Sequence, residues 1–160
     1  MKITAFIIIA LLATPLGTAA AAAPTGYAPF TGSWTCWSAR NSTVASRFSL
    51  SDQGDWLVLH TAWNNPAGDT GYWNHYYRRN AADGTWTTLG YGSNGWTFQG
   101  RSDGWKDNTL TFTGTQQTQS GNVKMRQTFQ LRTDGSFDHR WQAWDGKAWT
   151  TTSDSHCITP

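Results

Sequence analysis

Residues 121–144 read GNVKMRQTFQLRTDGSFDHRWQAW, and this stretch decides the fold class. It contains two runs, 122–131 and 136–144, separated by the pair Asp134-Gly135. In each run large apolar side chains alternate with polar ones, which is the pattern of a strand with one buried face. The Asp-Gly pair supplies the positive φ that a tight hairpin requires. The stretch therefore predicts two antiparallel neighbours in an all-β protein.

The same pattern extends over most of the chain. Short runs rich in Thr, Trp, Tyr and Phe alternate with Gly and Asp, and no stretch keeps a helical periodicity. Successive hairpins predict an up-and-down antiparallel barrel of about ten strands, because closure removes exposed sheet edges. The expected strands are 31–39, 44–50, 56–63, 70–78, 85–91, 95–101, 108–114, 122–131, 136–144 and 147–157.

The N-terminus has the layout of a secretory signal peptide. Lys2 precedes an apolar run over 3–13 and a tract of small residues over 18–23. The apolar run is too short for a bilayer span, which needs about 20 residues. We expect a signal peptide at 1–23, a single barrel domain at 24–160, and a secreted or periplasmic protein with no membrane span after cleavage.

The two cysteines, Cys36 and Cys157, lie near the two ends of the expected domain. In an exported protein an even cysteine count favours a disulfide. This bond would join the first strand to the last and close the barrel covalently. Two unpaired buried thiols are the alternative.

Charge excludes several classes of partner. The chain has 12 Lys and Arg against 10 acidic residues, all of them Asp, and a net charge of +2. The basic residues are scattered, whereas nucleic-acid binding requires them to cluster, so no nucleic-acid partner is expected. The chain also lacks a nucleophile motif and histidines at metal-ligand spacing. An enzyme is therefore the weaker hypothesis, and no metal site is expected.

Strand alternation predicts which side chains face the barrel interior. The inward set is mainly aromatic, with a few polar groups that include His139, Gln127 and, on the strand at 70–78, Tyr72, Asn74 and Tyr76. Such a mixture suits a small-ligand site, although the same rings would also fill a closed barrel. Whether His60 and His75 meet His139 is left open. The predicted ligand-binding residues are His139, Trp141, Phe137, Gln127, Met125, Phe129, Tyr76 and Trp96.

These observations favour an exported barrel that holds a small apolar or aromatic ligand. The alternative is binding of a carbohydrate or cell-envelope polymer, because 11 Trp is a high number for this length and a row of exposed rings can hold sugars. The candidates for such a row, at the outer surface or at loop ends, are Trp37, Trp63, Trp73, Trp105, Trp144 and Trp149.

The opening Gly32-Ser33-Trp34 resembles the Gly-x-Trp that begins calycin-type barrels, which include lipocalins, fatty-acid-binding proteins and nitrobindins. The second half, from 121–126 through 134–137 to 145–147, is similar to exported bacterial proteins with a nitrobindin-like barrel of about ten strands. The resemblance implies that Trp34 plugs the barrel floor.

Nitrobindins bind haem through a histidine near the C-terminus, and the resemblance implies His156 as the haem ligand here. Two features of the sequence bear on this expectation. Cys36 and Ser38 replace two glycines of the nitrobindin opening that let the strand approach the porphyrin closely, which counts against haem. In addition, alternation places His156 inside the barrel only if Cys157 points outward.

Overall fold

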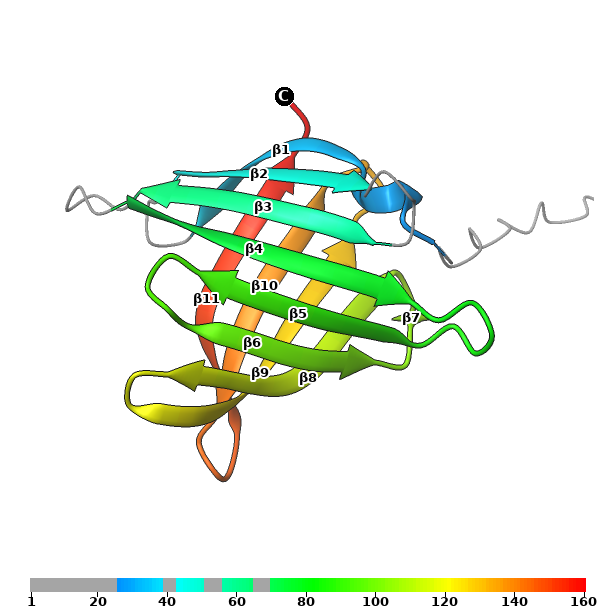
Figure 1. Ribbon diagram of the computed structural model, residues 1–160. Coiled ribbons are helices and arrows are strands. Elements are labelled where there is room, and N and C mark those ends of the chain that lie inside the picture. Colours follow the sequence, from blue (N-terminus) through cyan, green and yellow to red (C-terminus); the bar gives the residue numbers. More distant parts are fainter. Residues whose placement is uncertain (1–25, 39–42, 51–55, 65–69) are drawn as a thin grey trace, which may run out of the picture.

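The computed structural model describes residues 26–38, 43–50, 56–64 and 70–160 (Figure 1). The predicted signal peptide at 1–23 lies outside these residues. One short 3-10 helix, η1 (Ala28–Phe30), precedes the strands. The strands are β1 (Gly32–Ser38), β2 (Thr43–Leu50), β3 (Leu57–Asn64), β4 (Thr70–Arg79), β5 (Trp86–Gly92), β6 (Thr97–Ser102), β7 (Trp105–Lys106), β8 (Thr109–Thr118), β9 (Gly121–Leu131), β10 (Phe137–Trp144) and β11 (Trp149–Ile158).

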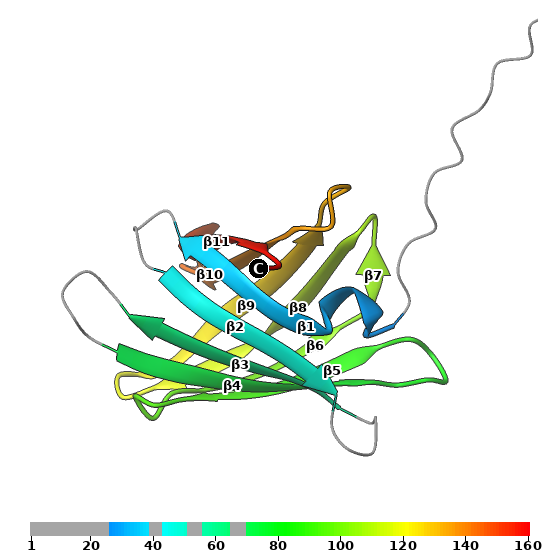
Figure 2. The ribbon, with the colours of Figure 1, turned by 90° about the horizontal axis from the view of Figure 1, so that it is seen from above.

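The described strands form a closed antiparallel barrel with sequential order. Strands β1 to β6 pair in consecutive order, and so do strands β8 to β11. The pairings of β1 with β11 and of β6 with β8 close the ring. Ten strands therefore make the wall in the described part of the chain, and β7 is a two-residue strand that pairs only with β8. The strands β1–β6 cross β8–β11 steeply (Figures 1 and 2). The predicted fold class is confirmed.

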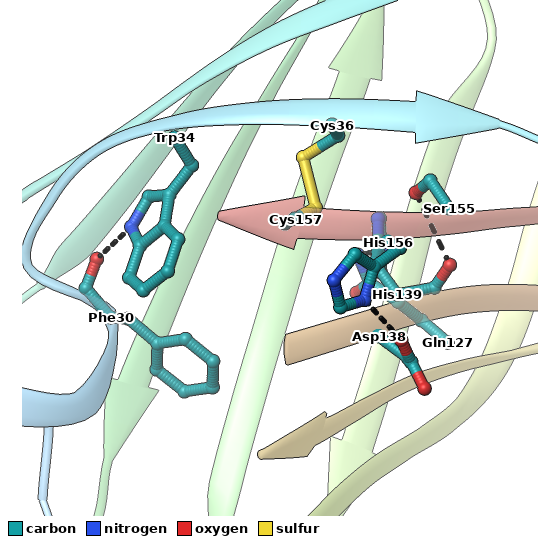
Figure 3. Close-up of a disulfide and its surroundings, with 9 residues drawn as sticks. All are labelled: Phe30, Trp34, Cys36, Gln127, Asp138, His139, Ser155, His156 and Cys157. Carbon is teal, nitrogen blue, oxygen red and sulfur yellow. Dashed lines mark hydrogen bonds and ion pairs between the residues drawn. A yellow bond between two sulfur atoms is a disulfide. The ribbon is translucent and has the colours of Figure 1, made fainter. Parts of the chain in front are cut away.

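A disulfide joins the first strand to the last, as predicted. Cys36 and Cys157 are direct cross-strand partners of β1 and β11, and both are buried. Each lies on the inner face of its strand (Figure 3). The bond spans 121 residues of sequence, so it constrains most of the unfolded chain.

The predicted hairpins form at their Asp-Gly and Asn-Gly pairs. At the β10–β11 turn, Gly146 has a φ of 99°, which favours glycine. The Asp145 carboxylate accepts hydrogen bonds from the backbone N–H groups of Lys147 and Ala148 at 2.8 and 2.7 Å. The β7–β8 hairpin was not predicted, because its turn uses Asp107-Asn108 at positive φ and contains no glycine.

One end of the barrel is filled by aromatic rings, and we call this end the floor. The Trp34 indole donates a hydrogen bond of 3.0 Å to the Phe30 carbonyl of η1 (Figure 3). Trp34 also meets Phe137 edge-on, with ring centroids 4.7 Å apart. Trp34 therefore lies in the floor, as the resemblance implied. The floor cluster consists of Phe30, Trp34, Phe48, Trp105, Phe129 and Phe137.

The inward faces of β8, β9 and β10 agree with the alternation in the sequence. Leu110 and Phe112 of β8 are fully buried, and so are Gln127 and Phe129 of β9. Their neighbours in sequence lie on the outer face, and the side chains of Lys124 and Gln130 are exposed. The hydrophobic pattern of these three strands therefore identifies the side chains that face the barrel interior.

Candidate functional site

The end of the barrel opposite η1 contains a pocket of about 560 Å³. Its lining comes from the later residues of β1, β3 and β8 and the earlier residues of β4 and β11, which lie together because neighbouring strands are antiparallel. Inward residues of β9 and β10, and Trp96 before β6, complete it. The volume falls within the range of small-molecule sites, about 300–1,000 Å³. The described lining consists of Ser38, Leu59, Thr61, Trp63, Trp73, His75, Trp96, Gln116, Met125, His139, Trp141, Thr151, Thr152, Ser153, Asp154 and Ser155.

Glycines opposite the large rings keep the pocket open. Trp73 and His75 of β4 pair directly across the sheet with Gly92 and Gly90 of β5. A Cβ atom at residue 90 would come within 2.2 Å of the His75 ring, and one at residue 92 within 2.9 Å of the Trp73 ring. The rings therefore lie against the neighbouring strand in space that only glycine leaves free. This arrangement holds them at the wall instead of across the centre.

His75 is the most unusual polar residue of the pocket wall. Its exposed fraction is 2%, and neither Nδ1 nor Nε2 has a hydrogen-bond partner among the described residues. The ring is stacked between Trp73 and Tyr77, with centroids 5.4 and 5.8 Å away. Burial, together with the nearby His139, lowers the pKa of His75 to about 3, so the ring is neutral at pH 7. A buried unpartnered polar group costs about 1–3 kcal/mol.

A hydrogen-bond network lies between the floor cluster and the pocket. The amide nitrogen of Gln127 lies 3.0 Å from the Tyr77 hydroxyl and 2.9 Å from Nε2 of His139. Because the amide nitrogen donates, Nε2 of His139 accepts, and the ring proton is on Nδ1. Burial lowers the pKa of His139 to about 4, so this ring is also neutral at pH 7. Gln127 is completely buried, and its contacts hold the His139 ring in one orientation.

The structure brings four of the predicted ligand-binding residues together around the pocket. His139 and Trp141 of β10, Met125 of β9 and Trp96 before β6 all belong to its lining. Gln127 lies beneath the pocket and is bonded to His139. Phe129 and Phe137 also face inward, but they belong to the floor cluster.

The predicted orientation of β4 is wrong. Tyr72, Asn74 and Tyr76 were expected to face inward, but the inner face of β4 carries Trp73, His75 and Tyr77. Tyr76 lies on the outer face beside the exposed Tyr91 of β5, with ring centroids 6.2 Å apart. Rings on both faces of β4 hide the phase of the alternation. Tyr76 is therefore not part of the pocket.

The haem ligand implied by the resemblance does not fit this structure. Cys157 points inward, so the adjacent His156 points outward, and its Nδ1 lies 2.9 Å from the Asp138 carboxylate (Figure 3). Burial opposes ionisation of Asp138, but Arg132 and His156 outweigh it and lower the pKa of this carboxyl. His156 therefore belongs to an outer charge cluster and not to the pocket wall.

Of His60, His75 and His139, two lie close together inside the barrel. His75 and His139 both contact Trp141, with ring centroids 5.6 and 6.0 Å away. His60 lies on the outer face, where its Nδ1 is 2.7 Å from Oδ1 of Asn74. Within the described ranges, three His, Cys, Asp or Glu residues do not come close enough together to hold a metal ion.

The six tryptophans proposed for sugar binding do not form one row. Trp63 and Trp73 line the pocket, and Trp105 packs against Phe30 in the floor. Trp37 is 46% exposed on β1. Trp144 and Trp149 pack against each other at the β10–β11 hairpin, and the Lys124 ammonium lies near both rings. This scatter removes the observation on which the polysaccharide alternative depended.

Trp73, His75 and Gln116 are among the lining residues that the predicted set did not include. The sequence contains a signal for Trp73 and His75. These two residues are two positions apart in one strand, and Gly90 and Gly92 are two positions apart in the next. Glycines with this spacing can accommodate two rings of a neighbouring strand. Gln116 falls two residues beyond the end predicted for its strand.

Comparison with known proteins finds no family model that matches the chain and no curated protein with a similar sequence. In the part of the chain that the structure describes, no helix has the length and apolar character to cross a membrane.

Proposed function

We propose that this protein is an exported carrier or sensor that binds a small apolar or aromatic ligand in the pocket at the open end of its barrel. Four tryptophans, Leu59 and Met125 supply the large apolar side chains of the wall, and smaller Ser and Thr residues, two histidines, a glutamine and an aspartate supply its polar groups. Ligand sites typically have this composition. A calycin-like assignment agrees with the closed ten-strand barrel and with the position of Trp34 in the floor. The disulfide suits an oxidising compartment.

The observation that carries the proposal is His75. A fold selected only for stability has no reason to keep a fully buried imidazole whose two nitrogens lack partners among the described residues. An apolar residue of similar size would avoid the cost of its desolvation. A ligand that reaches this ring would regain that free energy, which gives the bound state an advantage that the free protein lacks.

The test is to fill the pocket. We would titrate the protein with 1-aminoanthracene, an uncharged aromatic probe, by isothermal titration calorimetry and count bound molecules by native mass spectrometry. We expect one probe per protein. In Met125→Trp the new ring occupies the pocket, and we expect affinity to fall by about tenfold or more. Lys124→Trp is the matched control, because residue 124 is adjacent and its side chain is exposed on the outer face.

Probe binding that is equal in wild type and Met125→Trp would place the site outside the pocket and contradict the proposal. Absence of probe binding by a folded wild-type protein would contradict it as well. Near-ultraviolet circular dichroism of both variants verifies that the barrel is intact.

A further inference from the structure

The charge of the pocket narrows the class of ligand, provided that the proposed function holds. Among the described lining residues, Asp154 is the single Asp, Glu, Lys or Arg. Its carboxylate lies 3.1 Å from the Arg140 guanidinium, and both side chains are partly exposed. The described part of the pocket wall therefore offers no cation to a ligand anion.

Two further described cations, Lys124 and Arg126 of β9, are held on the outer face. The Arg126 guanidinium lies 4.7 Å from the Trp149 ring centroid, and its Nε donates to Gln142 at 2.6 Å. The Lys124 ammonium lies 5.6 Å from the Trp144 centroid. Alternation along β9 directs both away from the interior that Met125 faces. Reaching the pocket would require them to cross the sheet.

The two inner histidines do not replace the missing cation. His75 and His139 have pKa values of about 3 and 4, so neither carries a charge at pH 7. A neutral imidazole still has one N–H donor and one nitrogen acceptor, and it can bond to a hydroxyl or an amine without a change of protonation. The wall is thus built for hydrogen bonds between uncharged groups.

We propose that the pocket selects an uncharged aromatic molecule that carries a hydrogen-bonding group, and that it excludes carboxylates of the same size. A carboxylate that enters a mostly apolar pocket loses its hydration without gaining an ion pair, which is costly. An uncharged ring loses little, and its edge-to-face and stacked contacts with Trp73 and Trp141 add to the apolar area that it buries. The orphaned nitrogens of His75 are buried in the same wall, where a polar group of the ligand would supply the partner that they lack among the described residues.

Three probes with one skeleton test this selectivity: 2-naphthol, 2-naphthoate and 2-naphthylmethylammonium. At pH 7 they are neutral, anionic and cationic, respectively. We expect calorimetry to show that 2-naphthol binds about tenfold or more tightly than 2-naphthoate. Equal or tighter binding of 2-naphthoate overturns the inference and leaves the proposed function standing. Tighter binding of the cation than of 2-naphthol overturns it too, in favour of an aromatic cage. Failure of all three probes and of 1-aminoanthracene overturns the proposed function itself.

A matched pair of variants tests the cause of the selectivity. Gln116 lines the pocket, whereas the adjacent Gln117 is exposed on the other face of β8. We expect Gln116→Lys to raise the affinity for 2-naphthoate by about tenfold, because a cation near the site compensates the carboxylate. Gln117→Lys should leave it unchanged. If Gln116→Lys does not fold, Ser153→Lys at the exposed mouth gives the same test. An unchanged affinity in a folded pocket variant, or an equal gain in Gln117→Lys, overturns the inference.

Discussion

At the floor of the barrel the Phe137 ring lies 4.7–6.0 Å from four other aromatic rings, so its surroundings are closed on all sides. At the open end the Trp63 and Trp73 rings instead lie against Gly71 and Gly92, their direct partners on the neighbouring strands. Both ends are rich in aromatic side chains. The difference teaches that the residue opposite a ring, and not the number of rings, decides whether a small barrel is filled or open.

Loss of the disulfide should have the largest effect, because it loosens both ends together. In the double variant Cys36→Ser/Cys157→Ser we expect a loss of about 4–5 kcal/mol in the free energy of unfolding, on the chain-entropy argument for a loop of this size. Urea unfolding, monitored by tryptophan fluorescence, measures the loss. A loss below about 1 kcal/mol would mean that the pairing of β1 with β11 keeps the barrel closed without the disulfide.

A ring removed from the floor should cost more than a ring removed from the open end. Phe137→Ala leaves a cavity among packed rings, and we expect a loss of about 3–5 kcal/mol in the free energy of unfolding. Trp63→Ala removes a ring that already borders empty space, so its loss should be well below this range. The comparison of the two ends fails if both variants lose the same stability in urea.

Replacing a glycine that lies against a ring should lower the free energy of unfolding only while that ring is present. Gly90→Ala places a Cβ against the His75 ring, and we expect a loss of about 1–3 kcal/mol in the free energy of unfolding. In Gly90→Ala/His75→Ala the clash is absent, so Gly90→Ala should cost much less in that background. Thermal unfolding of the four proteins completes the cycle. Additive losses would show that residue 90 acts independently of the ring.

Acid should weaken the open half through its histidines. The pKa values of His75 and His139 lie below the ordinary value of 6.5, because burial disfavours their protonated forms. Folding stability is therefore unaffected by them above pH 6.5 and is lost as pH falls towards 3–4, where the unfolded chain binds protons that the folded protein does not. We expect each histidine to remove about 1.4 kcal/mol per pH unit within that window. Urea unfolding of wild type and His75→Leu between pH 7 and pH 4.5 measures the slopes. A slope that is the same in both proteins would contradict the neutral burial of His75.

Strands and hairpins could be predicted because both signals are local. Alternation with a period of two in β9 and β10 requires no knowledge of neighbours, and Asp-Gly pairs supply the left-handed conformation at the turns. The disulfide followed from the cysteines at the ends of a closed meander. The hairpin at Asp107-Asn108 escaped prediction because its left-handed residues are not glycines.

The candidate site was predicted only in part, because its geometry depends on pairing between strands. On β4, Tyr72, Trp73, Tyr76 and Tyr77 put rings on both faces, so the alternation has no readable phase. The open interior depends on rings meeting glycines across the sheet, which becomes visible only when the β4–β5 register is known. Alternation did identify His139 and Trp141, since β10 separates its two faces clearly.

The pairing of β1 with β11 makes the strand order circular. In such a ring no strand is intrinsically first, and the covalent bond between Cys36 and Cys157 holds the seam whatever the chain order. A circular permutant that joins β11 to β1 through a short linker and opens the chain at the exposed turn containing Asp83 would retain every strand pairing of the native protein. The disulfide would then close a local hairpin instead of the whole domain, so its contribution to stability would shrink while the barrel stayed the same.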